Sequence, residues 1–178
     1  MCRRPERIIA VEPMPSNLAA LRANLQQHGF ESSVTVVPYA LGKAEDRVGF
    51  TLYPRMPGNS TRHPAEKREL QGSCMAASWF AGASAVQCPV RTVSSIIDEL
   101  GTACVHLLKL DVEGSELEVL QGIEERHWTR VQQVVAEVHE INGRVDVIET
   151  LLVLKGFTVV GVQSVPSCNW LLYAVRKP

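Results

Sequence analysis

The sequence VHLLKLDVEGSELEVL, residues 105–120, decides the fold class of this chain. It opens with the apolar run 105–110, turns acidic up to Gly114, and continues with apolar residues at helical spacing, namely Leu117, Leu120 and Ile123. This pattern predicts a buried strand that passes through a tight turn into a helix. Ligands of open α/β sheets bind beyond the carboxyl ends of the strands, so the acids of this turn are candidate site residues: Asp111, Glu113 and Glu116.

Strands and helices alternate along the rest of the chain, which predicts an α/β sandwich with a mostly parallel sheet. Further helices are expected from Pro15 to Gly29, from Thr92 or Ser94 to Leu100, and from Arg144 to Lys155. Strands are expected at residues 7–12, 34–37, 47–53, 86–92, 105–110 and 130–138. Two last strands, 157–162 and 169–176, are predicted to form a C-terminal antiparallel hairpin.

One domain covering residues 1–178 accommodates all these elements, because the length suits a single core. Residues 40–42 are read as a loop. Residues 54–85 are rich in Pro, Gly, Ser and charge and are predicted to be a long irregular loop insertion with room for one helical turn. Loops of that length in a compact domain are often lids or binding loops.

Composition excludes several classes of function. Hydrophobic residues make up 46% of the 178 residues and charged residues 21%, and the 18 basic and 19 acidic residues give a net charge of −1. This balance lacks the basic stripe of a nucleic-acid-binding protein. We also expect no membrane helix, because no apolar run reaches about 18 residues.

The cysteines and the N-terminal residues predict a cytoplasmic protein. Residues 1–7 lack the apolar core of a signal peptide. The number of cysteines is odd and no two lie close in sequence, which predicts free thiols rather than a disulfide framework: Cys2, Cys74, Cys88, Cys104 and Cys168.

Several motifs in order resemble the FkbM-type family of S-adenosylmethionine-dependent methyltransferases. They are Val11-Glu12-Pro13, Asn24, Ala40-Leu41-Gly42, the segment LLKLDVEGSELEVLQG from Leu107 to Gly122, and the segment from Val135 to His139. The resemblance implies the Rossmann-like, three-layer fold of class I methyltransferases. It also implies S-adenosyl-L-methionine as cofactor and O-methylation of a small molecule, a sugar or a natural-product intermediate, with a hydroxyl group as the acceptor.

One family feature is missing from this sequence. In the family a first strand and a Gly-rich loop precede the Glu-Pro strand, whereas here no Gly-x-Gly lies before Glu12. The family's sheet order is 3-2-1-4-5-7-6, in which the first strand lies between the strand that ends at Glu12 and strand 105–110. Without that first strand, the strand before Glu12 has no neighbour on the side of strand 105–110. The chain is then a truncated fragment, or its sheet closes differently, or another chain, such as a second copy in a homodimer, supplies the strand. The alternative function is a degenerate domain that acts as an interaction module.

The resemblance assigns cofactor contacts to three residues outside the acidic turn. Glu12 ends a strand, where a carboxylate can accept both hydroxyls of the cofactor's ribose. The alternative is an ordinary surface acid before Pro13. Ala40 and Leu41 are assigned to the adenine ring, and the alternative is a plain turn closed by Gly42.

The acids of the turn have different predicted roles. Asp111 is expected near the methyl sulfonium, where it could bind the cofactor's amino group, a metal or the acceptor hydroxyl. Glu113 is predicted to be functional, whereas Glu116 suits the start of a helix, where the macrodipole favours negative charge. Lys109 interrupts an apolar strand and is expected to pair with a neighbouring carboxylate.

A second pair of titratable residues ends the next predicted strand. Glu137 and His139 are two residues apart and therefore point to the same face. His139 is the predicted general base, because imidazole exchanges protons near neutral pH. The alternative is a structural histidine. Asp111, Glu113, Glu137 and His139 could also hold Mg²⁺ or Mn²⁺, which accept oxygen ligands and an imidazole.

A nucleotide hydrolase is excluded. Residues Asp111 to Gly114 match the D-x-x-G pattern of GTPases, but that pattern requires a phosphate-binding loop upstream. Gly42-Lys43 lacks the first glycine of such a loop and is followed by Ala44.

Overall fold

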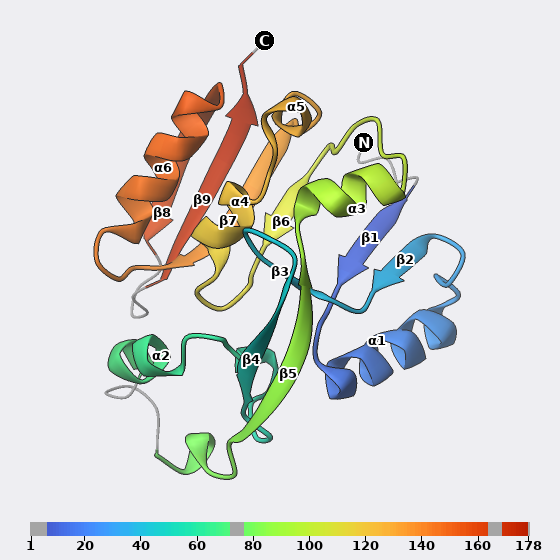
Figure 1. Ribbon diagram of the computed structural model, residues 1–178, viewed down its shortest axis with the longest axis vertical. Coiled ribbons are helices and arrows are strands. Elements are labelled where there is room, and N and C mark those ends of the chain that lie inside the picture. The colour runs from blue at the N-terminus through green and yellow to red at the C-terminus, as the bar shows by residue number, and fades with distance from the viewer. Residues whose placement is uncertain (1–6, 72–76, 164–168, 178) are drawn as a thin grey trace.

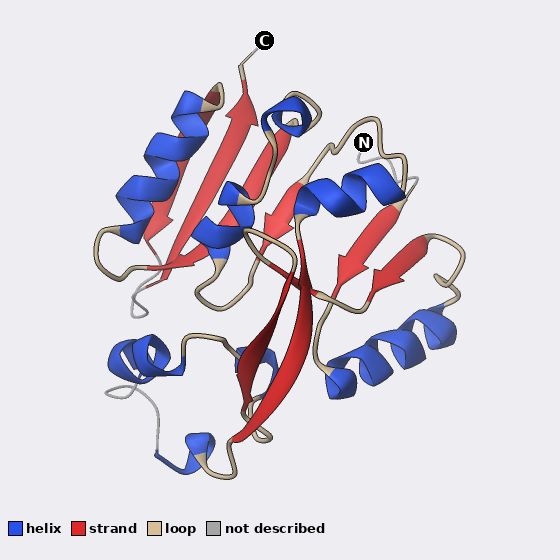
Figure 2. Ribbon diagram, in the orientation of Figure 1, coloured by secondary structure: helices blue, strands red, loops and turns tan. Residues whose placement is uncertain are grey.

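A computed structural model describes residues 7–71, 77–163 and 169–177 of the chain. Its strands and helices alternate, with α3 to α6 lying in front of the strands in the view of Figures 1 and 2. The α/β fold expected from the sequence is therefore present. No helix of the described residues is both long and apolar enough to cross a bilayer.

The first unit is a parallel strand pair with a connecting helix. Strand β1 (Ile8–Val11) leads into α1 (Pro15–His28) and then into β2 (Val34–Val37), which pairs parallel to β1. Pro15 occupies the first turn, where its missing N–H costs nothing. Gly29 closes the helix in the left-handed conformation at φ 69°, as a C-terminal glycine commonly does. These local signals make the predicted bounds of this unit accurate.

A four-stranded sheet forms the second unit, in the order β6-β7-β9-β8. Strand β6 (Leu108–Leu110) is parallel to β7 (Gln133–His139), and β9 (Asn169–Arg176) is antiparallel to both β7 and β8 (Phe157–Gln163). The predicted C-terminal hairpin is confirmed. Helices α4 (Glu116–Gln121), α5 (Glu125–Trp128) and α6 (Arg144–Leu154) pack on this sheet over a fully buried core that includes Leu120, Val134, Ile148, Leu152 and Phe157.

The segment between these units forms a third sheet. The two-residue strand β3 (Ala40–Leu41) is parallel to β5 (Ser84–Arg91), and β4 (Asp46–Leu52) is antiparallel to β5. Figure 1 shows β4 and β5 running together away from the four-stranded sheet. The prediction of a loop at residues 40–42 is wrong in part, because Ala40 and Leu41 find a partner 50 residues away at Val90 and Arg91. Helix α3 (Val93–Glu99) follows β5 and is capped by Thr92, whose Oγ1 accepts the Ser95 N–H at 3.0 Å.

The insertion 54–85 is more regular than predicted. It contains the 3-10 turn η1 (Pro57–Asn59), helix α2 (Pro64–Gln71), the 3-10 turn η2 (Ala77–Phe80) and the start of β5 at Ser84. Buried Tyr53 packs edge-on against Phe80, with ring centroids 5.3 Å apart, and so fixes the insertion to the β4 strand. The interpretation of residues 54–85 as an irregular loop is wrong. Contacts between residues distant in sequence, such as Tyr53 and Phe80, order the insertion, and such contacts leave no periodic pattern in the sequence.

Strands β1 and β6 each pair along one edge only within the described residues. Ile8 on β1 is 42% exposed, and Leu107, just before β6, is 55% exposed. This agrees with the expectation that the strand before Glu12 lacks a neighbour. It also explains why β6 is shorter than the predicted strand 105–110: Val105 makes only an isolated bridge to Val131.

The free thiols are confirmed for Cys88 and Cys104. Cys2, Cys74 and Cys168 lie outside the described residues, as does Pro166 of the loop before β9. Burial first, and the charge of Glu12 second, raise the pKa of the Cys88 thiol.

Candidate functional site

A cavity of about 100 Å³ lies where β1, β3 and β6 end. Five residues singled out from the sequence line it together: Glu12, Ala40, Leu41, Asp111 and Glu113. They come from segments up to 100 residues apart, and the strand ends bring them to one place, as expected for an open α/β sheet. The other lining residues are Val11, Pro13, Met14, Asn17, Tyr39, Phe50, Pro57, Gly58, Ser60, Val112 and Ser115.

Glu12 is fixed just before the N-terminus of α1 by two hydrogen bonds. Its Oε1 accepts the Met14 N–H at 2.7 Å, and its Oε2 accepts the Asn17 amide at 3.3 Å. A carboxylate has about four lone-pair positions, so each oxygen of Glu12 can accept a further bond. The half-buried side chain is therefore both fixed and able to bind hydroxyl donors from the cavity.

Asp111 is a second carboxylate that lines the cavity. Lys109 donates to Asp111 Oδ2 at 2.8 Å, which confirms the predicted pairing of Lys109 with a neighbouring carboxylate. Their side chains are 64% and 43% exposed, so this ion pair contributes little to stability. The Asp111 carboxylate keeps its exposure and can still bind a partner in the cavity.

The turn after Asp111 is tight and strained. Glu113 has φ 52° and Gly114 has φ 101°, so two successive residues occupy left-handed conformations. Only glycine adopts φ 101° freely, which confirms that Gly114 permits the turn. Glu113 has no such freedom, and surrounding contacts must hold it there. One of them is the buried Thr61 hydroxyl, which donates to the Glu113 carbonyl at 2.6 Å.

Glu116 opens α4 and is fully buried. Its Oε1 accepts the Gly114 N–H at 3.0 Å and so closes the turn, while Oε2 has no hydrogen-bond partner. Burial raises the pKa of the Glu116 carboxyl, against the lowering effect of the Gly114 hydrogen bond and of the charges of His139 and Arg144. The helix-start location is as predicted, and the side chain is a buried structural acid.

Glu113 stands between the cavity and two buried basic groups. Its Oε2 pairs with Lys67 Nζ and lies 3.5 Å from His139 Nε2. Lys67 is 4% exposed and His139 is 5% exposed. Neither lines the cavity, so His139, the predicted general base, does not open onto it directly. His139 contacts the lining residue Glu113 instead.

The predicted divalent-metal set is not assembled. Asp111 pairs with Lys109, Glu137 accepts a hydrogen bond from the Asn169 amide at 2.7 Å, and His139 faces Glu113. In the described part of the chain, one group of three side chains offers ligand atoms within 4.8 Å of one another, and it lies elsewhere.

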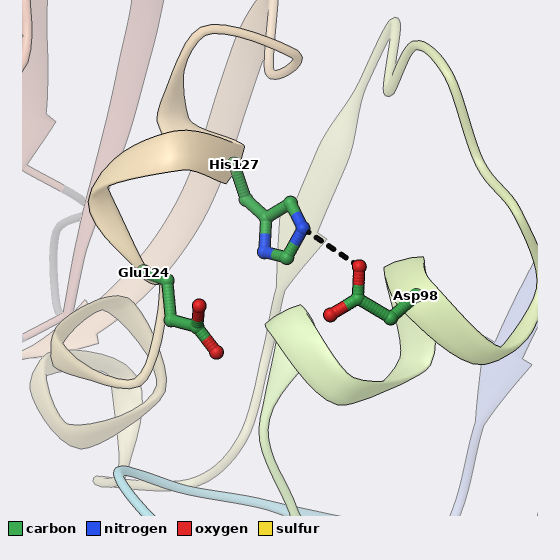
Figure 3. A group of neighbouring side chains, drawn as sticks. All are labelled: Asp98, Glu124 and His127. Atoms are coloured by element: carbon green, nitrogen blue, oxygen red, sulfur yellow. Dashed lines mark hydrogen bonds and ion pairs between the residues drawn. The ribbon is translucent and has the colours of Figure 1, made fainter.

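That group consists of Asp98 on α3 with Glu124 and His127 at α5, and Figure 3 shows His127 pointing toward Asp98. His127 Nε2 lies 3.1 Å from Asp98 Oδ1. Arg126 donates to both carboxylates, at 2.7 Å to Asp98 Oδ2 and at 2.7 Å to Glu124 Oε2. A guanidinium therefore already compensates the two negative charges, and the group ties α5 to α3.

Two site residues were missed from the sequence, Thr61 and Lys67. Pro64 followed by a run of charged residues indicates a helix start, but nothing in that run marks Lys67 as buried. Its partner Glu113 is 46 residues away. Only the folded contact identifies it.

The cavity combines apolar side chains with carboxylates. Leu41, Phe50 and Val112 are among its apolar lining residues, and Glu12, Asp111 and Glu113 are its carboxylates. The apolar side chains suit a flat, apolar ring, and the carboxylates suit hydroxyl or amino donors attached to it. These acceptor and apolar groups therefore fit a nucleoside that carries a cationic group.

Comparison with known proteins adds independent findings. A family model described as the methyltransferase FkbM domain matches residues 2–159. The methyltransferase sdnD of Sordaria araneosa is 36% identical over 168 residues, covering 86% of this chain and 65% of that protein. The 31-O-demethyl-FK506 methyltransferase FkbM of Streptomyces tacrolimicus is 36% identical over 169 residues, covering 86% and 64%. The chain thus spans somewhat less than two thirds of the length of these curated relatives.

A solved structure has the same fold. It is the crystal structure of methyltransferase FkbM from Methylobacillus flagellatus, with a TM-score of 0.63 and 20% sequence identity. The match covers 95% of this chain and 36% of that one. The Rossmann-like architecture is therefore established for nearly all of the chain.

Proposed function

Because this chain belongs to the FkbM methyltransferase domain family, we propose that it forms the cofactor-binding core of an S-adenosylmethionine-dependent enzyme that methylates a hydroxyl group of a small molecule. The observation that carries the proposal is the shared cavity of Glu12, Ala40, Leu41, Asp111 and Glu113. These residues were assigned to the cofactor and the reaction from sequence motifs alone, and they lie together. The free thiols of Cys88 and Cys104 favour a cytoplasmic location.

The cavity residues have distinct tasks in this proposal. Glu12 accepts the two ribose hydroxyls, since both of its oxygens have spare lone pairs. Ala40 and Leu41 lie along the adenine ring. Asp111 binds the amino group of the methionine part, because an exposed carboxylate is a good acceptor for an ammonium group.

The reaction requires little covalent chemistry from the protein. When bound, S-adenosylmethionine supplies an electrophilic methyl group on its sulfonium sulfur. The acceptor hydroxyl would lose its proton as its oxygen received that methyl group, so the site needs a group that can accept the proton. Glu113 is the cavity carboxylate placed to take that proton, and His139 lies behind it at 3.5 Å. Positioning accounts for most of the acceleration in reactions of this kind.

Labelled methyl transfer tests the proposal. The full product of the gene is incubated with S-adenosylmethionine carrying a ¹³C-methyl group and a panel of hydroxylated small molecules. We expect a ¹³C signal at the chemical shift of an O-methyl group. Label appearing only on nitrogen or carbon would overturn the assignment to hydroxyl acceptors, and no transfer across sugars, phenols and polyketide alcohols would argue against the activity.

A second candidate function, a binding module without methyl transfer, is favoured by the open strand edges and by one apolar surface. Val160, Val162, Tyr173 and Val175 on β8 and β9 are between 43% and 59% exposed, and Val160 pairs directly with Tyr173. Apolar surface of this kind marks a site of association. Analytical ultracentrifugation decides whether it is used: a concentration-dependent homodimer that Val160→Lys abolishes would support the binding module.

A further inference from the structure

Helix α2 is docked onto the acidic turn by contacts between distant segments. Besides the Thr61 and Lys67 contacts to Glu113, His63 Nε2 lies 3.2 Å from Glu118 Oε1. Arg144 of α6 donates to Glu66 of α2 at 2.6 Å. Residues 61–67 therefore lie across the turn that follows β6 and form part of its environment.

The burial of Lys67 demands a specific explanation. Lysine is almost never fully buried unless it is paired, and an ammonium group taken out of water costs several kcal/mol. Lys67 is 4% exposed, and the Glu113 side chain with which it pairs is 16% exposed. An anchor for α2 alone would not require a charge, because an apolar side chain of similar size fills such a position at no cost in desolvation.

The location of the partner carboxylate supplies that explanation. Glu113 lines the cavity, whereas Lys67 and His139 lie on its far side. A cation within hydrogen-bonding distance favours the ionised form of a carboxylate and fixes its orientation. The backbone of Glu113 is held independently by the Thr61 hydroxyl, even though its φ is 52°. Both the backbone position and the side-chain direction of Glu113 are thus set by residues 61–67.

We infer that Lys67 is a positioning residue: it holds the Glu113 carboxylate oriented at the cavity, in place to accept the proton that the acceptor hydroxyl loses. This inference rests on the proposed function for its chemistry. Lys67 itself does not touch the reacting atoms. The electrostatic coupling of Lys67, Glu113 and His139 follows from the geometry alone and can be measured without an acceptor.

The test is an NMR titration of the His139 imidazole in ¹⁵N-histidine-labelled full gene product. His139 Nε2 lies 3.5 Å from the Glu113 carboxylate, which also pairs with Lys67 of α2, and the charges of His139 and of Arg144 on α6 both act on Glu116 of α4. Removing one positive charge in Lys67→Met is expected to move the titration midpoint of His139 upward relative to wild type. Removing the negative charge in Glu113→Gln is expected to move it downward, and Lys67→Arg should keep it near the wild-type value.

A matched control separates coupling from general loss of an ion pair. Lys155→Met removes a lysine that pairs with Glu125, whose side chain is 81% exposed, and it should leave His139 unchanged. An unchanged His139 titration in Lys67→Met would overturn the inference. If Lys67→Met does not fold, the His139 titration is measured in Lys67→Gln instead. This variant also removes the positive charge, but its amide can still donate a hydrogen bond to Glu113.

Calorimetric titration with S-adenosylhomocysteine in the same samples distinguishes this inference from the proposed function. If wild-type protein binds no S-adenosylhomocysteine but the His139 shifts occur, the coupling stands and its role in methyl transfer is overturned. If binding occurs and the shifts are absent, the proposed function stands and Lys67 is only an anchor of α2.

Discussion

A Cβ atom on Gly122 would lie 2.3 Å from the carbonyl oxygen of Gly42. The C-terminus of α4 therefore touches the backbone at the end of β3, and both glycines are buried. This contact joins the C-terminus of α4, the helix that follows the acidic turn, to the strand that carries Ala40 and Leu41.

We predict that Gly122→Ala destabilises the protein. The obstructing atom is backbone and cannot rotate away, and overpacking of this kind costs about 1–3 kcal/mol, occasionally more. In a chain of this size each kcal/mol lowers the melting temperature by about 2–4 °C. Gly49→Ala is the control, since the nearest atom there belongs to the Gln87 side chain at 3.5 Å. Equal melting temperatures for the two variants would refute the close contact.

Glu116 should make stability depend on pH in a defined direction. Burial raises the pKa of its carboxyl above the ordinary 4.5. The folded chain thus keeps this proton longer than the unfolded chain does, so the associated stability is fully present below about pH 4.5 and is lost as the pH rises through the folded-state pKa. Glu116→Gln stays neutral, and its melting temperature relative to wild type should therefore increase with pH.

Thermal melts across the range from about pH 4 to about pH 9 check this prediction. Glu149→Gln, a change at an exposed position of α6, provides the control for the loss of one negative charge. The expectation fails if the Glu116→Gln difference stays constant or shrinks as the pH rises.

The hydrogen bonds of the Thr61 hydroxyl should contribute more to the free energy of unfolding than a hydrogen bond on the surface does. It donates to the Glu113 carbonyl at 2.6 Å and accepts the His63 N–H at 3.0 Å, and the residue is fully buried. Thr61→Val keeps the shape but leaves these partners unsatisfied, at a cost of about 1–3 kcal/mol. Denaturant unfolding measures the loss, with Thr158→Val on exposed β8 as reference. Equal losses would show that the hydroxyl does not hold the turn.

The open edge of β1 predicts an alternating pattern of amide exchange. Ile8 and Glu12 donate to the carbonyls of Ser33 and Val37 on the β2 side. Successive amides of a strand point to opposite edges, so Ile9 and Val11 face the open edge. In the 178-residue chain their amides should exchange faster than that of Ala10 by hydrogen-exchange NMR. Equal protection of all three would indicate that another segment covers this edge.

Local sequence signals predicted the elements that end or begin with a distinctive residue. Pro15, Gly29 and Thr92 mark helix boundaries through their own backbone geometry or hydroxyl, so α1 and α3 were located correctly. The hairpin of β8 and β9 was predicted because its two runs are apolar and close in sequence.

Contacts between distant segments could not be predicted from the sequence. Strand β3 exists only because Ala40 meets Val90, and α2 is placed by partners at residues 113, 118 and 144. The cavity residues could be predicted because the motifs, taken in their order along the chain, mark the ends of strands. The fold then brings those strand ends together. For His139, alternation along β7 gives the face of the side chain but not what covers it.

The central claim is that the cavity between Glu12 and Asp111 binds S-adenosylmethionine, and calorimetry with S-adenosylhomocysteine tests it most directly. The full gene product should bind, and Glu12→Gln should weaken binding at least about tenfold, equivalent to about 1.4 kcal/mol, because a carboxylate that accepts two hydroxyls is lost. Glu31→Gln, an exposed acid after α1, should bind like wild type. Equal affinity of the Glu12 and Glu31 variants, or no binding by the wild-type protein, would contradict the account.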